Sequence, residues 1–157
     1  MFEDFDDFAQ EHDKKKSDRE LIAKEAANQW ANLLSLVPKL ADGNRGFNGQ
    51  TFSWVLDAGV LCLGDVAARF ERVSVHNSPE RGHYVTFGRA PAFPGKMYLE
   101  DSPIRAETWN LELQLTNGEF TWSASGFGGT VPAEVLVNII ARHLSACYLE
   151  YEKAYGR

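Results

Sequence analysis

Residues 106–126, AETWNLELQLTNGEFTWSASG, decide the fold, because they have the pattern of two strands joined by a tight turn. Asn117-Gly118 is the preferred dipeptide of a two-residue type I′ hairpin turn. With this turn fixed, apolar residues fall on one face of the hairpin and polar residues on the other, which specifies the register. The apolar face carries Leu111, Leu113, Leu115, Phe120, Trp122 and Ala124. The sequence therefore predicts an antiparallel sheet with one buried face.

Further strands are expected before this hairpin, because the apolar residues alternate with a period of two from Glu71 onward. Residues 71–89 predict a hairpin with its turn at residues 79–82, and residues 96–100 (KMYLE) predict a short strand. Residues 41–50, rich in Gly and Asn, predict a loop. Together these segments predict an antiparallel β-meander of about five strands.

Two segments predict helices that cover the sheet. The first begins at a capping box formed by Ser17 and Glu20 and ends near Val37, before Pro38. The second follows an N-cap at Thr130. The apolar stripe of the first helix is Ile22, Ala26, Trp30, Leu33, Leu34 and Val37, and that of the second is Leu136, Ile140, Leu144, Cys147 and Tyr151.

Residues 51–70, TFSWVLDAGVLCLGDVAARF, fit two patterns. A helical stripe runs through Phe52, Leu56, Val60, Leu63, Ala67 and Phe70, although Gly59 and Gly64 would each cost about 1 kcal/mol inside a helix. The alternation of Phe52, Trp54 and Leu56 indicates strands instead. We prefer the helix, which gives a two-layer α+β fold with an N-terminal, a second and a long C-terminal helix on one face of the meander.

Charge divides the chain of 157 residues into an acidic tail, residues 1–13, and one α+β domain, residues 14–157. The tail alone accounts for the net charge of −6, so the domain is neutral and offers no broad positive field for nucleic acid. No apolar run approaches the roughly 20 residues of a membrane span, and no apolar leader is seen. With two cysteines only, a cytoplasmic protein is expected.

Residues 80–90, ERGHYVTFGRA, partly match the RNA-reading strand of an RNA recognition motif. The match covers residues 84–87 and then fails, because His83 stands where Gly or Ala belongs and Tyr84 is the only outward aromatic left. The glycines at 126, 128 and 129 precede a helix, but no Lys-Ser or Lys-Thr follows, so they form no P-loop. Neither nucleic acid nor a cofactor is expected.

The histidines and cysteines predict no metal site and no catalytic group. If Val73 and Val75 share the face of Val85 and Phe87, odd residues pair with odd ones, and His76 and His83 then point to opposite faces. His143 and Cys147 share a helical face, but their apolar neighbours predict burial rather than a nucleophilic pair. An enzymatic role is therefore disfavoured.

Two functions remain. The first is a non-enzymatic protein-binding domain, chaperone-, immunity- or adaptor-like, that also forms a homodimer through the polar sheet face or the sheet edge. Its candidate contacts are Phe2, Phe5 and Phe8 in the acidic tail, which is otherwise a frayed terminus, and Tyr84, Glu112 and Gln114 on the sheet. The alternative is a small-molecule binder or enzyme with a pocket between the sheet and the last helix, lined by His143, Tyr151, Trp109, Trp122 and Phe87.

Overall fold

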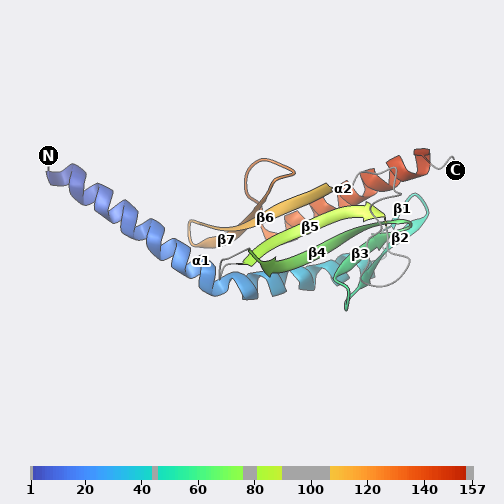
Figure 1. The fold of residues 1–157 in the computed structure, drawn as a ribbon, viewed down its shortest axis with the longest axis horizontal. Coiled ribbons are helices and arrows are strands. Elements are labelled where there is room, and N and C mark those ends of the chain that lie inside the picture. Colours follow the sequence, from blue (N-terminus) through green and yellow to red (C-terminus); the bar gives the residue numbers. More distant parts are fainter. Residues whose placement is uncertain (1, 44–45, 76–80, 90–106, 155–157) are drawn as a thin grey trace.

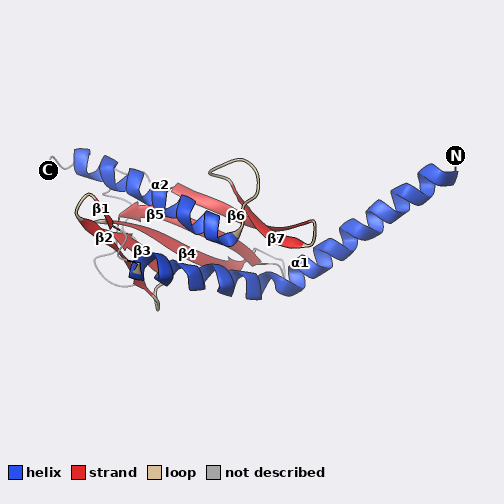
Figure 2. Cartoon of the chain, turned by 180° about the vertical axis from the view of Figure 1, so that it is seen from behind, coloured by secondary structure: helices blue, strands red, loops and turns tan. Residues whose placement is uncertain are grey.

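The computed structural model places two helices on one face of a curled, seven-stranded antiparallel sheet that forms a half-barrel (Figures 1 and 2). It describes residues 2–43, 46–75, 81–89 and 107–154, with side chains from residue 8 onward. Strand order follows chain order throughout. The elements are α1 (Phe2–Asp42), β1 (Gly46–Phe47), β2 (Gln50–Val55), β3 (Val60–Leu63), β4 (Val66–Ser74), β5 (Arg81–Arg89), β6 (Glu107–Thr116), β7 (Glu119–Ala124) and α2 (Ala133–Ala154).

The β6–β7 hairpin has the predicted turn and register. Leu113 lies opposite Trp122, and Thr116 lies opposite Glu119. Asn117 and Gly118 both have positive φ, at 52° and 79°, as a type I′ turn requires. The predicted strand at 96–100 lies outside the described residues.

The preferred helix at residues 51–70 is wrong, because this segment forms β2, β3 and the first half of β4. Gly64 has φ +57° and opens a two-residue turn in which Leu63 pairs with Val66. Gly59 has φ +64° and closes the loop in which Val55 pairs with Val60. Both glycines adopt the left-handed conformation that a turn needs and a helix cannot use. In the described residues the sheet therefore has seven strands rather than about five. The same part of the chain has two helices rather than three.

The predicted loop at 41–50 contains a second Asn-Gly hairpin. Asn48 and Gly49 have φ of 51° and 82° and join β1 to β2, with Phe47 opposite Gln50. The turn chemistry is the same as at Asn117-Gly118.

The pairing of β4 with β5 corrects the predicted face of the valines. Phe70 lies opposite Val85 and Ala68 opposite Phe87, so even residues pair with odd ones. Val73 is consequently on the outer face, where it is exposed. The prediction failed because it assumed that Val73 and Val75 face the core, whereas both are exposed. The turn also comes earlier than predicted, since Arg81 and Gly82 belong to β5 and pair with β4. His76, which was predicted to point to the face opposite that of His83, lies outside the described residues.

Helix α1 is longer than predicted at both ends. It begins at Phe2, so Ser17 is an interior residue and forms no cap. It also continues through Pro38 to Asp42. A proline near a helix end removes one backbone hydrogen bond, and here the added turn buries Leu40 against the core, which offsets that loss. The predicted stripe from Ile22 to Val37 faces the core as expected.

Helix α2 buries all five residues predicted for its inner face. Its first backbone hydrogen bond runs from the Leu136 amide to the Pro132 carbonyl, so Pro132, and not Thr130, is the N-cap residue. Val131 exchanges two backbone hydrogen bonds with Trp122, at 2.7 and 2.8 Å. This bridge fixes the start of α2 against β7. The core lies between the concave sheet face and the two helices (Figure 2).

Candidate protein-binding surface

The N-terminal half of α1 leaves the body of the protein, as Figure 1 shows at the left. We call residues 2–21 the projecting segment. From Phe8 to Leu21 every side chain except that of Asp18 is exposed, and Phe8 is 72% exposed. The first stripe residue that packs on the core is Ile22. At 1.5 Å per residue, Phe8 lies about 21 Å from Ile22 along the helix axis.

Among the described side chains, those from Phe8 to Leu21 do not belong to the core cluster, so the body gives this part of the helix little support. Short isolated helices are marginal in water, because nucleation is costly and most helical stability in proteins comes from packing. The i,i+4 spacing of opposite charges allows three ion pairs, each worth about 0.2–0.5 kcal/mol: Glu11 with Lys15, Lys14 with Asp18 and Lys16 with Glu20. The segment is therefore a weakly supported helix with unpartnered side chains between residues 8 and 17.

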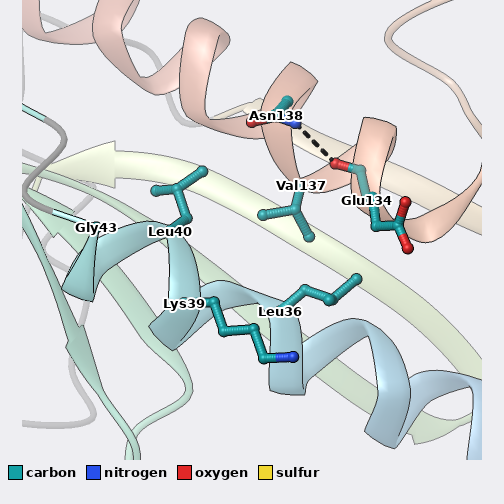
Figure 3. A pocket seen from close by; sticks show the side chains of 7 residues that line it. All are labelled: Leu36, Lys39, Leu40, Gly43, Glu134, Val137 and Asn138. Atoms are coloured by element: carbon teal, nitrogen blue, oxygen red, sulfur yellow. Dashed lines mark hydrogen bonds between the residues drawn. The ribbon is translucent and has the colours of Figure 1, made fainter.

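A groove of about 340 Å³ lies between α1 and α2 (Figure 3). Leu36 and Leu40 of α1 face Val137 of α2 across it. Lys39 and Glu134 bring one charge of each sign to its rim. The sequence analysis missed this groove, because it ended the first helix at Val37. Continuing the stripe by one helical turn would have reached Leu40.

The five residues of the predicted ligand pocket fall into separate places. Phe87, Trp109 and His143 form one cluster, with ring centroids 4.5 to 4.8 Å apart. Trp122 instead packs beside Trp30, with ring centroids 6.1 Å apart. Tyr151 is buried on the inner face of α2. The rings of Phe87, Trp109 and His143 are in direct contact, so they leave no room for a ligand between one another.

His143 forms a hydrogen bond with Glu107, a residue that the sequence did not single out. His143 Nε2 lies 2.7 Å from Glu107 Oε2, and Trp109 Nε1 donates a hydrogen bond to Glu107 Oε1 at 2.9 Å. The hydrogen bond from Trp109, with that of His143, holds the pKa of Glu107 below its usual range. This pair ties α2 to the first residue of β6. Alternation alone would have placed Glu107 on the same face as Trp109, but no pattern pairs it with His143.

Cys147 cannot serve as a nucleophile beside His143 at neutral pH. Burial, together with the carboxylates of Glu150 and Glu107, raises the pKa of its thiol to about 11. Since the thiolate is the reactive form, the thiol is inert under these conditions. This agrees with its predicted role as a packing residue.

The polar sheet face carries the predicted contacts Tyr84, Glu112 and Gln114. Gln114 Nε2 donates a hydrogen bond to Ser123 Oγ at 3.3 Å. The Tyr84 ring lies over Gly82, where an added Cβ would come within 2.4 Å of the Tyr84 hydroxyl. Glu112 is exposed. These residues do lie on one face, and its use as an interface stays a prediction.

His83 is the buried polar residue of the core and is 6% exposed. Its ring packs beside those of Trp30 and Trp122, with ring centroids at 5.1 and 5.4 Å. Arg72 Nε donates a hydrogen bond to His83 Nε2 at 3.2 Å. Burial, and then the Arg72 charge, lowers the pKa of His83 to about 4. His83 is therefore neutral at pH 7 and serves as a hydrogen-bond acceptor within an aromatic cluster.

Within the described residues, no three His, Cys, Asp or Glu side chains gather closely enough to hold a metal ion. The helices of that part of the chain include none long and apolar enough to cross a membrane.

Comparison with models of protein families, with curated proteins and with solved structures finds no match to this chain. The surfaces described above are therefore the evidence from which a function can be proposed.

Proposed function

We propose that this protein is a non-enzymatic protein-binding domain, and that the projecting segment of α1 is its binding surface. The observation that carries the proposal is the exposure of nearly every side chain from Phe8 to Leu21 on a helix that has left the body. A helix of this kind gains from docking, because its partner supplies the packing that the body does not.

The sequence of the projecting segment fits such docking. Phe2, Phe5 and Phe8 are three residues apart, a spacing that places them on one side of a helix. Aromatic side chains on an exposed helix are suitable anchors for a partner, since they bury a large apolar area. The surrounding carboxylates keep the free segment soluble. These properties suit a chaperone-, immunity- or adaptor-like protein.

The small-molecule alternative receives less support. Its proposed lining includes Phe87, Trp109 and His143, whose rings are in contact with one another. A nucleophilic pair of His143 with Cys147, which the sequence disfavoured separately, would need the Cys147 thiolate, and a pKa of about 11 makes that form scarce at neutral pH.

Site-specific photo-crosslinking in intact cells tests the proposal. A photoreactive phenylalanine analogue replaces Phe8 in one variant and Glu112, on the polar sheet face, in a matched control. We expect discrete covalent adducts to a protein from position 8 and none from position 112. Adducts from position 112 alone would place the binding surface on the sheet, and no adduct from position 8 would overturn the proposal.

A further inference from the structure

We propose that the partner of the projecting segment is a second copy of this chain, and that two segments pair antiparallel, helix against helix. The inference rests on the proposed function, since it names the partner for the same surface. Three features of the segment carry it: the change in the sign of its charge, the continuity of α1, and the exposed apolar residue at its base.

The charge of α1 changes sign along the segment. Residues 1–13 contain six carboxylates and neither Lys nor Arg. Residues 14–24 contain Lys14, Lys15, Lys16, Arg19 and Lys24 against Asp18 and Glu20, a net charge of +3 from five basic and two acidic side chains. An acidic end of net charge −6 is thus followed directly by a basic stretch.

The continuity of α1 lets the two charged stretches meet within one molecule only at their boundary, as at Glu11 and Lys15. Both belong to one uninterrupted helix, Phe2–Asp42, so the acidic end cannot fold back onto the basic stretch. A second molecule can supply each stretch with its opposite. In a parallel pair of helices like charges would lie side by side. In an antiparallel pair the acidic stretch of each copy lies against the basic stretch of the other. Charge therefore selects the antiparallel arrangement, which has the two-fold symmetry of the commonest dimers.

Laying the acidic stretch of one copy, residues 1–13, on the basic stretch of the other, residues 14–24, puts the two-fold axis near the boundary between the two stretches, at about His12. With the axis at His12, the axial level of Phe8 is that of Lys16 in the other copy. Long basic side chains can cover aromatic rings with their stems and attract them through cation–π contacts. The level of Phe2 is that of Leu21 and Ile22, and Leu21 is 42% exposed. The overlap of the two segments thus includes Leu21, an exposed apolar residue.

The pairing explains why the segment leaves the body. Residues 2–22 span about 30 Å of helix, enough for two copies to overlap over several turns without contact between their sheets. Ion pairs at an exposed interface are weakened by salt, so the dimer is expected to dissociate as ionic strength rises.

Sedimentation of the purified full-length protein tests the inference through a charge swap. One variant carries Lys14→Glu, Lys15→Glu and Lys16→Glu, and the other carries Asp4→Lys, Asp6→Lys and Asp7→Lys. We expect a wild-type dimer at about 50 mM salt that weakens at about 500 mM. Each variant alone should dimerise more than about tenfold less tightly, because the attraction between the acidic and the basic stretch is then lost or reversed. An equimolar mixture should recover a heterodimer. Circular dichroism and thermal unfolding check that both variants keep the folded body.

The outcomes separate this inference from the proposed function. A wild-type monomer at all concentrations, with position 8 crosslinked to a different protein in cells, would overturn the self-pairing and leave the proposed function standing. A dimer that neither charge variant weakens would place the interface elsewhere, in the α1–α2 groove or on the sheet, and would also overturn it. A dimer restored only by mixing the two variants supports it.

Discussion

The two halves of α1 have the same backbone structure and opposite surroundings. From Ile22 to Leu40 the apolar stripe packs on the sheet and on α2, and Leu33 and Val37 are fully buried. From Phe8 to Leu21 the side chains face solvent. The comparison shows that helix formation and helix burial are separate properties of this sequence. Burial stabilises the packed half of α1, whereas only docking or local ion pairs can stabilise the projecting segment.

The largest effect is expected in the packed half. Leu33→Ala removes a fully buried side chain and leaves a cavity between α1 and the sheet, so we expect the free energy of unfolding to fall by about 3 kcal/mol. Urea denaturation monitored by tryptophan fluorescence measures it. A loss below about 1 kcal/mol would mean that this half of α1 is not part of the core.

The packed half should also make stability depend on pH through His83, which contacts Trp30. The folded pKa of His83 is about 4, below its ordinary value of 6.5. Between these values the unfolded chain binds more protons, so stability is complete above pH 6.5 and is lost as the pH falls toward 4. The loss from this group reaches up to about 3 kcal/mol.

The measurement compares urea midpoints of the wild type and His83→Gln at several pH values. Gln remains neutral and can still accept the hydrogen bond from Arg72, so its curve should be flatter between pH 6.5 and 4. Glu107, whose lowered pKa also reduces stability in acid, is present in both proteins and cancels in the difference. Parallel curves for the two proteins would show that His83 does not titrate in this range.

A helix break in the projecting half should leave the body intact. Ser17→Pro interrupts α1 before the first packed residue, so the helical signal in circular dichroism should fall while the free energy of unfolding changes by less than about 0.5 kcal/mol. Ala31→Pro, an exposed position in the packed half, is the matched control and should destabilise the body by about 3 kcal/mol or more. Equal losses for both would contradict the division of α1 into two halves.

The smallest effect on stability is expected for Phe8→Ala. Its side chain is 72% exposed, so the free energy of unfolding of the monomer should change by less than about 0.5 kcal/mol. The same variant should weaken dimer formation in sedimentation. A large loss of monomer stability would show that Phe8 packs on the body.

Local turn chemistry made part of this fold predictable. Asn117-Gly118 lies between two long alternating segments, so turn and register could both be predicted. Asn48-Gly49 makes the same turn, but β1 has only two residues and shows no alternation, and the turn was taken for part of a loop. Gly59 and Gly64 could be counted as a cost to a helix, yet their positive φ values became clear only from the pairing of β2, β3 and β4.

The candidate site was harder to predict, because it depends on tertiary structure. The sequence indicated Phe2, Phe5 and Phe8 and their acidic surroundings, but it gave no reason for α1 to extend without interruption from Phe2. Pro38 suggested a helix end, and packing of Leu40 overrode it. The pairing of His143 with Glu107 joins residues 36 positions apart, which no local pattern can reveal.

Hydrogen exchange of the amides from Phe8 to Leu21 tests the account most directly. In concentrated protein at low salt we expect these amides to be protected, and in dilute protein at high salt to exchange rapidly, while the amides from Leu33 to Leu40 stay protected in both. Such a result would show that a second copy supports the projecting segment and the body supports the rest. Protection of residues 8–21 that does not change with protein concentration, or rapid exchange under every condition, would contradict it.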